Sequence, residues 1–351
     1  MTQGLDLDDV RTRLTQWFKS KMPGARDLAL SGLDRPKGGL SNETYSLELR
    51  WKEAGVDRRQ KLVIRWVPPR FPLYPRYDIK EQFLVFKHLH AAGIPVPKAL
   101  WLEEDPSVIG HQFCIVEHVE GWIPPDNPPY HVAGPLFDST PERRARIWNQ
   151  TVEVMAKIHT LDWHRAAMKF LGVPKTGTGP IDQHIAYFEW MMSTATPPTD
   201  PVLDAAKKWL KKNVPIPRYV SLCWGDARLG NVICQDDNVV AVLDWETAML
   251  ADAEADLAWM LHVDWYMGEG YGLPRLEGLP GPDETVAYYE KLTGRKVENL
   301  FYHDVFATWR QGVIHHKEEP TLKAMGYIPA DFPSINTANY EKIKRLLGLS
   351  R

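Results

Sequence analysis

The hydrophobic pattern of the chain changes at Gly121, and this change limits the folds that are open to it. Before that residue, short apolar runs such as KLVIRWV at 61–67 and HQFCIVEHVEG at 111–121 are typical of strands. After it, longer segments have apolar residues at helical spacing, as in ERRARIWNQTVEVMAKIHTLD at 142–162. The sequence therefore predicts an α+β protein with two lobes, 1–120 and 121–351.

The first lobe is expected to be a small antiparallel sheet with one crossover helix. An amphipathic helix is predicted at 6–22, ahead of a β, β, α, β, β order. These five elements are expected at 38–49, where a turn enters a strand, and at 61–67, 78–94, 96–105 and 111–121.

The second lobe is predicted to be mostly helical, with strands only in YVSLCWGD at 219–226 and NVICQDDNVVAVLDWE at 231–246. The latter segment reads as a hairpin that turns at 236–238. The segment after Pro320 is weakly patterned.

Charge and composition exclude several classes of protein. The net charge of −3 predicts neither a nucleic-acid nor a membrane-binding surface. There is no apolar run long enough to span a bilayer, and the start MTQGLDLDDVRTRL does not have the pattern of a signal peptide. The 3 cysteines are too scattered for a disulfide framework or a zinc site, so a reduced, cytoplasmic location is expected.

Three oxygen-bearing side chains carry the functional prediction. Asp226 and Asn231 lie in one loop, and Asp244 ends the next strand. Because a hairpin returns on itself, we expect Asp244 to come back beside Asn231. Phosphoryl transfer needs a carboxylate near the acceptor hydroxyl and hard oxygen ligands for Mg²⁺. Asp-x₄-Asn followed by a strand-borne Asp is the spacing of the protein-kinase catalytic loop and metal-binding Asp.

Together, WGDARLGNVI at 224–233 and AVLDWETAMLADAEADLAWM at 241–260 resemble the signature of the aminoglycoside phosphotransferase and choline kinase-like superfamily. The resemblance extends to GGLSNETYSL, the family's nucleotide-positioning loop, and to LVIRWVPP, IKEQFLVFKHLHAAGIPVPKAL and FCIVEHVEG. Within the superfamily, the chain is most similar to the subgroup that includes the kinase-like N-terminal domain of certain long acyl-CoA dehydrogenases.

The resemblance implies a bilobal, protein-kinase-like fold that uses ATP and Mg²⁺. Asp226 would orient the acceptor hydroxyl, Arg228 would contact the γ-phosphate or the substrate, and Asn231 and Asp244 would hold the metal. The resemblance also implies a set of residues that bind the nucleotide. Ser41 and Asn42 lie in the glycine-rich turn, Arg65 would contact phosphate, and Glu81 would form an ion pair with Arg65. Glu117 and Val119 lie at the hinge that would border the adenine crevice.

Four positions depart from the usual pattern of the superfamily. Trp224 stands where His is common, and Arg65 replaces the phosphate-binding Lys. Ala251 and Ala253 replace the Gly and Pro of the usual G-D-P. These departures leave the base and the metal ligands intact, and they place the chain away from the antibiotic-resistance enzymes.

Each of these residues also has a plain structural interpretation. Asp226 and Asn231 could cap a turn, Arg65 could be a solvated strand residue, and Arg228 an exposed loop residue. Asp256 is expected to hold the catalytic loop by accepting backbone hydrogen bonds. His159 is expected to be a structural residue at a helix end. His315 and His316 are also expected to be structural, because neighbours on a helix cannot easily bind one ion. Most of the aromatic residues of the second lobe are expected to belong to its core, namely Trp190, Trp259, Trp265, Tyr266 and Tyr271.

The predicted activity is ATP- and Mg²⁺-dependent transfer of phosphate to a hydroxyl of a small molecule. The subgroup resemblance implies a hydroxyacyl-CoA or another apolar alcohol as acceptor. The alternatives are an aminoglycoside or macrolide phosphotransferase, a nucleotide-binding pseudokinase module, and a metal-dependent hydrolase that uses the same acids with water.

Overall fold

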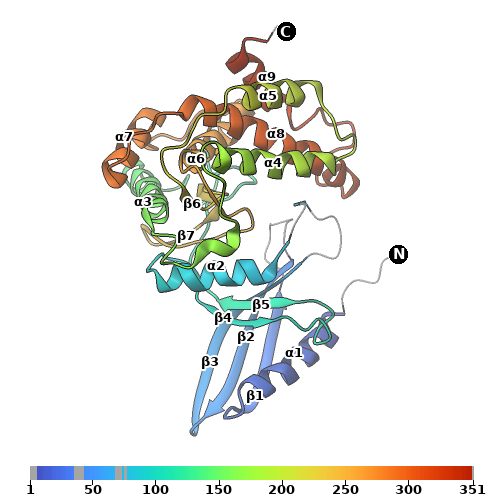
Figure 1. The fold of residues 1–351 in the computed structure, drawn as a ribbon. Coiled ribbons are helices and arrows are strands. Elements are labelled where there is room, and N and C mark those ends of the chain that lie inside the picture. The colour runs from blue at the N-terminus through green and yellow to red at the C-terminus, as the bar shows by residue number, and fades with distance from the viewer. Residues whose placement is uncertain (1–5, 35–42, 68–72, 75–76, 350–351) are drawn as a thin grey trace. The chain divides into compact units, whose positions relative to one another are not determined.

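The computed structural model describes residues 6–34, 43–67, 73–74 and 77–349. These residues form two compact units, each of which is described by itself. The first consists of Met1–Ala91 with Pro97–Val119, and the second of Ala92–Val96 with Glu120–Arg351 (Figure 1).

The first unit is built on a five-stranded antiparallel sheet in the order β1-β2-β3-β5-β4. This sheet, together with the helical second unit, confirms the predicted α+β class and kinase-like architecture. The elements are α1 Leu7–Lys21, β1 Arg26–Asp34, β2 Glu43–Glu53, β3 Val56–Trp66, α2 Ile79–Ala91, β4 Ala99–Glu103 and β5 Phe113–Glu117.

Strand β1 was not expected, since the sequence predicted only four strands in this part of the chain. Its pairing with β2 is irregular, with register shifts between Arg26 and Ala29 and between Gly32 and Asp34. The backbone at Leu33 also has a positive φ of 108°. These irregularities break the strict alternation by which a strand is recognised in a sequence.

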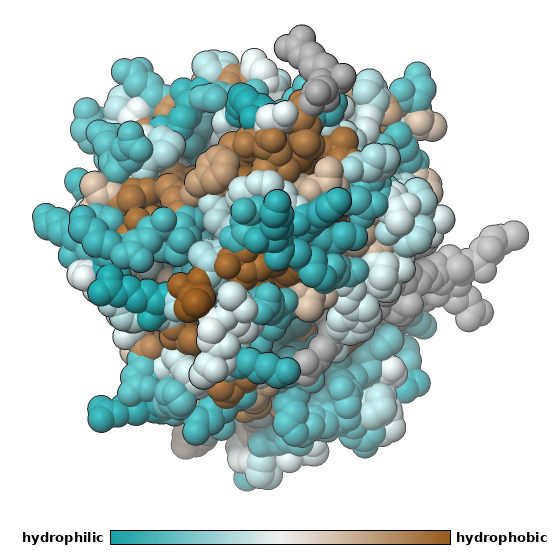
Figure 2. All heavy atoms as spheres, turned by 45° about the horizontal axis from the view of Figure 1, so that its top comes forward, coloured by the Kyte–Doolittle hydropathy of each residue, from teal (hydrophilic) through white to brown (hydrophobic). Residues whose placement is uncertain are grey.

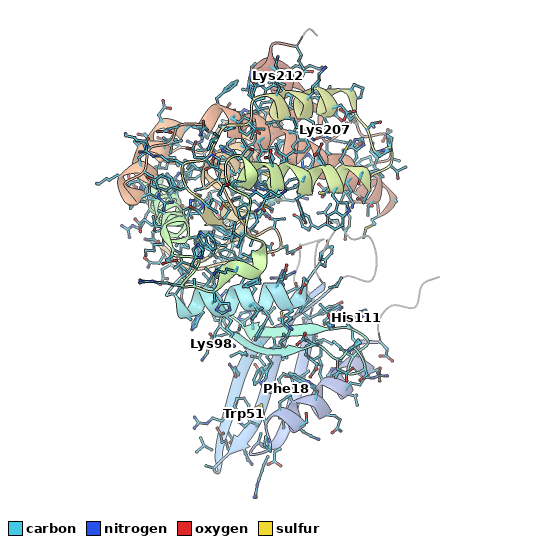
Figure 3. The ribbon with its side chains drawn as sticks, viewed as in Figure 1. Phe18, Trp51, Lys98, His111, Lys207 and Lys212 are labelled. Atoms are coloured by element: carbon cyan, nitrogen blue, oxygen red, sulfur yellow. The ribbon has the colours of Figure 1, made fainter. Side chains whose placement is uncertain are left out.

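Helix α1 covers one face of this sheet. Asp6 caps its N-terminus by accepting hydrogen bonds from the backbone N–H groups of Asp8 and Asp9. The apolar stripe of the helix packs on alternate residues of the central strands, and Phe18 of α1 and Trp51 of β2 are labelled in Figure 3. Because side chains alternate along β3, Arg65 lies on the face opposite to Ile64 and Trp66.

The second unit is mostly helical, and its long helix α8 packs against α4, α5, α6 and α9. The elements are α3 Pro141–Thr160, α4 Gly179–Ser193, α5 Pro201–Lys212, β6 Ser221–Cys223, β7 Val232–Gln235, β8 Asn238–Val242, β9 Met249–Ala251, α6 Glu254–Met267, α7 Pro282–Thr293, α8 Leu300–Ala324 and α9 Thr337–Leu347. The predicted hairpin is confirmed as β7–β8.

Two features of the second unit differ from the expectation. Strand β9 pairs with β6, so the two strand segments read from the sequence were not the only ones. Helix α8 continues through Pro320, and α9 follows in the weakly patterned tail. Strand β9 has only 3 residues, too few for an alternating pattern to be visible.

The surface of the second unit that Figure 2 shows is mostly hydrophilic, with hydrophobic residues in separate patches. Among the described residues, no helix is both long enough and apolar enough to cross a membrane.

Gly121 begins the loop that leads into the helices, and the backbone there lies against strand β7. Trp122 and Cys234 exchange two backbone hydrogen bonds of 2.8 and 2.7 Å. Gly121 has a φ of +149°, and a Cβ atom added to it would lie 2.5 Å from the carbonyl oxygen of Cys234. Only glycine fits such a close approach of two backbones.

We therefore expect Gly121→Ala to lower the free energy of unfolding by about 3 kcal/mol, through backbone strain and the clash together. Gly272→Ala is the matched control, because Gly272 also has a positive φ of +71° but has nothing within 4 Å of an added Cβ atom. It should cost only about 1 kcal/mol. Urea unfolding of both variants measures this, and equal losses would contradict the proposed clash.

Candidate active site

The buried carboxylate of Asp256 holds the loop between β6 and β7 in place through two hydrogen bonds from the loop backbone. One carboxylate oxygen accepts from the backbone N–H of Trp224 at 2.6 Å, and the other accepts from that of Gly225 at 3.0 Å. His159 also contacts Asp256 at 3.0 Å, and its other ring nitrogen lies 2.8 Å from the hydroxyl of Tyr289. The expected structural roles of Asp256 and His159 are thereby confirmed.

Cys223 lies beside His159 and Asp256, and their potential ligand atoms are within 4.8 Å of one another. Their bonding is nevertheless that of a structural network, because both ring nitrogens of His159 and both oxygens of Asp256 have protein partners. Burial, reinforced by nearby carboxylates, raises the pKa of Cys223 well above its usual value, so the thiol stays protonated. We therefore interpret the cluster as support for the loop.

Trp224, which departs from the usual His, links this loop to the end of β8. Its indole N–H donates to the carbonyl oxygen of Leu243 at 2.6 Å, and its ring stacks on that of Trp245 at 5.9 Å between centroids. Leu243 and Trp245 flank Asp244 in the chain. The departure therefore provides a contact that holds the backbone on either side of Asp244.

The carboxylate of Asp226 accepts hydrogen bonds on both of its oxygens. Oδ1 accepts from the indole N–H of Trp259 at 2.7 Å, and Oδ2 accepts from Asn231 Nδ2 at 2.6 Å and from Arg228 Nε at 3.1 Å. Burial alone raises the pKa of Asp226, but the charges of Arg228 and Arg310 and the Trp259 hydrogen bond outweigh it and lower the pKa. Asp226 is therefore ionised at neutral pH.

Asp126 is a member of the site that the sequence analysis missed. Both of its carboxylate oxygens lie 2.7 Å from Arg228 Nη1, so Arg228 bridges Asp126 and Asp226. Gly230 leaves room for this pair, because a Cβ atom there would lie 2.5 Å from Asp126 Oδ1. Asp126 precedes Arg228 by 102 residues and lies in a proline-rich loop, so no local pattern marks it.

The hairpin brings the two predicted metal ligands to neighbouring positions. Val232 pairs with Val242, and the carbonyl oxygen of Asn231 accepts from the backbone N–H of Leu243 at 2.8 Å. Asp244 is the next residue and has a φ of +57°, a left-handed conformation that Asp tolerates better than most residues. The structure thus places Asp244 where the returning strand meets Asn231.

Asn231 itself is 3% exposed, and its orientation is set by two hydrogen bonds. Its Nδ2 donates to the backbone oxygen of Asp226 at 2.9 Å and to Oδ2 of the same residue at 2.6 Å. Because the amide nitrogen is used in this way, the carboxamide oxygen is the atom left for a metal. A carboxamide and a carboxylate oxygen form a donor set that fits Mg²⁺.

The residues predicted to bind nucleotide belong to the first unit or fall outside the described residues. Arg65 lies on β3 opposite Cys114 and is buried, and Glu81 lies half-buried in the first turn of α2. Glu117 is exposed at the end of β5, and Val119 follows it. The roles of these four residues stay predictions. Ser41 and Asn42 lie outside the residues that the structure describes.

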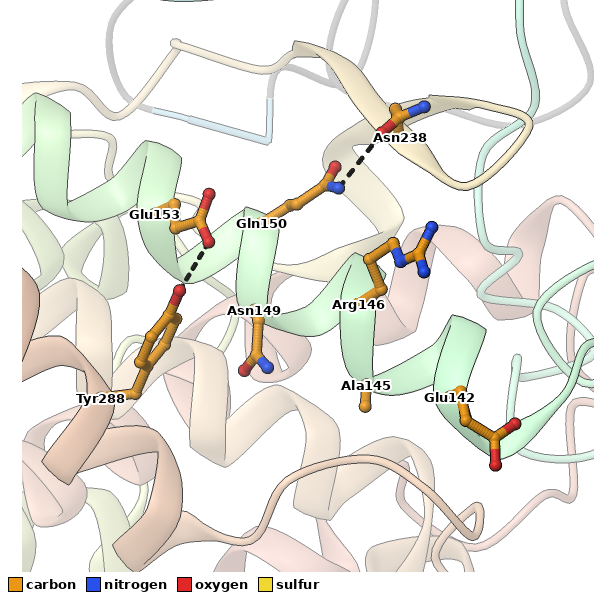
Figure 4. Close-up of a pocket in the computed structure, with 8 residues that line it drawn as sticks. All are labelled: Glu142, Ala145, Arg146, Asn149, Gln150, Glu153, Asn238 and Tyr288. Atoms are coloured by element: carbon orange, nitrogen blue, oxygen red, sulfur yellow. Dashed lines mark hydrogen bonds between the residues drawn. The ribbon is translucent and has the colours of Figure 1, made fainter.

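An open groove of about 700 Å³ on the outer side of α3 does not include any of these site residues (Figure 4). It is lined by Glu142, Ala145, Arg146, Asn149, Gln150, Glu153, Asn238 and Tyr288. Gln150 accepts from the backbone N–H of Val239 at 2.7 Å and donates to Asn238 at 3.3 Å. The polar groups of the groove therefore hold the β7–β8 hairpin against α3.

In sequence, the chain resembles parts of longer proteins. The chain is 28% identical over 297 residues to acyl-CoA dehydrogenase family member 11 of Rattus norvegicus, covering 82% of this chain and 36% of that protein. It is 31% identical over 249 residues to acyl-CoA dehydrogenase family member 10 of Mus musculus, covering 70% of this chain and 21% of that protein. The chain thus spans about a third or less of the length of these relatives.

Solved structures share the fold. A Ralstonia eutropha protein provisionally described as an aminoglycoside phosphotransferase has a TM-score of 0.67 and 22% identity, covering 95% of this chain and 98% of its own. A thermostable mutant of aminoglycoside phosphotransferase APH(4)-Ia, in a ternary complex with ADP and hygromycin B, has a TM-score of 0.53 and 15% identity, with the same coverage of both chains.

The family itself is given by residues 33–289, which match the model of the phosphotransferase enzyme family, abbreviated APH. This segment includes most of the first unit and, in the second, the loop with Asp226, the hairpin with Asn231 and Asp244, and helix α6. The match covers more than half of the chain and agrees with the fold and with the geometry around Asp226. The chain therefore belongs to the phosphotransferase enzyme family.

Proposed function

We propose that the protein is a kinase that transfers the γ-phosphate of ATP to a hydroxyl group of a small molecule in a Mg²⁺-dependent reaction. The observation that carries this proposal is that Asn231 and Asp244 flank the two strands of one hairpin and that Asn231 donates to Asp226. An ionised carboxylate and two hard oxygen ligands are the groups that phosphoryl transfer requires. ADP bound to the structurally similar APH(4)-Ia mutant supports a nucleotide as the phosphate donor.

In this mechanism Asp226 accepts a hydrogen bond from the acceptor hydroxyl and orients it for in-line attack. Arg228, which is held by Asp126, would supply positive charge to the transferred phosphoryl group. Asn231 and Asp244 would hold Mg²⁺, which neutralises phosphate charge when bound. We assign nucleotide binding to the first unit, through Ser41, Asn42, Arg65, Glu81, Glu117 and Val119, and acceptor binding to the second.

The acceptor is proposed to be an alcohol on an apolar group. Trp259, whose N–H reaches Asp226, belongs to an apolar cluster with Val263, and Met267 and Ile314 pack against it half-buried. These residues form a core behind Asp226 and do not line a cleft, so the choice of an apolar acceptor depends on the similarity to the relatives described above. The similarity to acyl-CoA dehydrogenase family members makes a hydroxyacyl-CoA the first candidate within this class.

An antibiotic acceptor is the second candidate, because hygromycin B is bound to the APH(4)-Ia mutant. Asp126 is 40% exposed beside Arg228 and is the acidic group that a cationic sugar would meet. Since Asp126 is already paired with Arg228, its charge is largely compensated, and we rank this acceptor second.

The function is tested by incubating the protein with Mg-ATP and a panel of hydroxyacyl-CoAs, free hydroxy acids, apolar alcohols, aminoglycosides and macrolides. We expect ³¹P NMR and mass spectrometry to show a phosphorylated hydroxyacyl-CoA or alcohol. Asp226→Ala should lower the rate by about 10³-fold, since a group that handles the acceptor proton contributes 10²–10⁴-fold. Its affinity for ATP should be unchanged.

Asp236→Asn is the control, because Asp236 is an exposed residue in the turn of the same hairpin. It should keep wild-type activity. Binding of Mg-ATP without transfer to any acceptor would favour the pseudokinase alternative. Release of phosphate at a rate independent of every acceptor would favour the hydrolase.

Removal of a metal ligand gives a separate prediction. Asp244→Asn should raise the Mg²⁺ concentration needed for half-maximal activity by at least tenfold, because one anionic ligand is lost. Asn238→Ala, at the turn of the same hairpin, should leave it unchanged. Mg²⁺ titrations of activity and Mn²⁺ binding followed by electron paramagnetic resonance measure both effects, and equal metal affinity in Asp244→Asn and wild type would remove Asp244 from the metal site.

A further inference from the structure

Two buried residues behind Asp226 have no part in the mechanism described above. Trp259 on α6 donates to Asp226, and Arg310 on α8 lies over the face of Trp259. We propose that Trp259 and Arg310 are positioning residues that fix the direction in which Asp226 accepts the acceptor hydroxyl. This inference rests on the proposed function, and it assigns the pair a role in kcat rather than in nucleotide binding.

The carboxylate of Asp226 has few acceptor sites left for a hydroxyl. An ionised carboxylate offers about four lone-pair sites on its two oxygens. Among the described residues, Asn231 and Arg228 donate to Oδ2, whereas Trp259 alone donates to Oδ1. The site left for a hydroxyl is therefore on Oδ1, and the hydrogen bond from Trp259 decides which way that site points.

The indole of Trp259 is held in place by Arg310. Trp259 is 4% exposed, and the guanidinium carbon of Arg310 lies 3.8 Å from the centroid of its ring. Arg310 is itself 1% exposed and lies 5.0 Å from the ring of Phe188 on α4. A planar cation stacked on an indole restrains its tilt, and it polarises the ring so that the N–H becomes a better donor.

The decisive variant is Trp259→Phe, which removes the N–H donor but keeps an aromatic ring beneath Arg310. We expect kcat to fall by about tenfold or more, the usual effect of losing a hydrogen bond to a charged group, with KM for Mg-ATP unchanged. Trp265→Phe is the matched control on the same helix, since the Trp265 ring also lies under a cation, Lys342, at 4.4 Å. It should retain wild-type kcat.

Two variants of Arg310 separate its charge from its shape. Arg310→Met removes both the charge and the planar stack on Trp259, so it should lower kcat and leave KM for Mg-ATP unchanged. Arg310→Lys keeps the charge but not the planar stack, so it should also lower kcat if the stack is what holds the indole. Circular dichroism and thermal unfolding would identify any variant that does not fold.

A spectroscopic readout separates this proposal from the proposed function. In ¹⁵N-tryptophan-labelled protein, the Trp259 indole N–H resonance, assigned through Trp259→Phe, should shift when Asp226→Asn or Arg310→Met is introduced. A wild-type protein that phosphorylates no acceptor would overturn the function, whereas the indole shift would still support the coupling. Wild-type kcat in Trp259→Phe, or an indole resonance insensitive to Asp226→Asn, would overturn the positioning role.

Discussion

The site depends first on the hydrogen bonds that the buried carboxylate of Asp256 accepts from the backbone of Trp224 and Gly225. A loop that enters a helical unit has backbone N–H groups that need partners once water is excluded. Asp256 on α6 supplies the acceptor oxygens. His159 on α3 contacts Asp256, and Tyr289 on α7 contacts His159. Three helices thereby determine where the loop carrying Asp226 can lie.

Around this support, charges are placed so that Asp226 stays ionised despite its burial. An isolated buried carboxylate would become neutral, because burial disfavours the charged form. Arg228 is paired with Asp126 on one side of the Asp226 carboxylate, and Arg310 lies behind Trp259 on another side. The cations thus come from two directions. In the proposed mechanism, this arrangement would orient an acceptor hydroxyl without any covalent chemistry.

The local parts of this arrangement could be predicted from the sequence. Asp226 and Asn231 are five residues apart in one loop, and the β7–β8 hairpin returns Leu243 to Asn231 by simple pairing. Short-range geometry of this kind follows from spacing and turn chemistry. The structural role of Asp256 was also predicted, because it followed the loop at the start of a helix in a recognisable motif.

The rest could not be predicted, since it depends on contacts between segments far apart in the chain. Asp126 reaches Arg228 across 102 residues, and it lies in a loop with no periodic pattern. Trp259 was expected to be one of several core aromatics, and nothing in its spacing distinguished its N–H as the donor to Asp226. Arg310 lies in a helix that is buried around most of its circumference, where a single cation gives no periodic signal.

The sequence by itself therefore predicted the α+β class and the family, and it placed Asp226, Asn231 and Asp244 in segments that fold on themselves. The catalytic and metal-binding roles of these three residues stay predictions. Tertiary structure alone decided which oxygens of Asp226 are occupied, which cations surround it, and which glycines must remain glycines. Those properties arise where α6, α8 and the loop with Asp126 pack against the hairpin. Packing at close range depends on atoms from all of these segments at once, and no single segment contains that information.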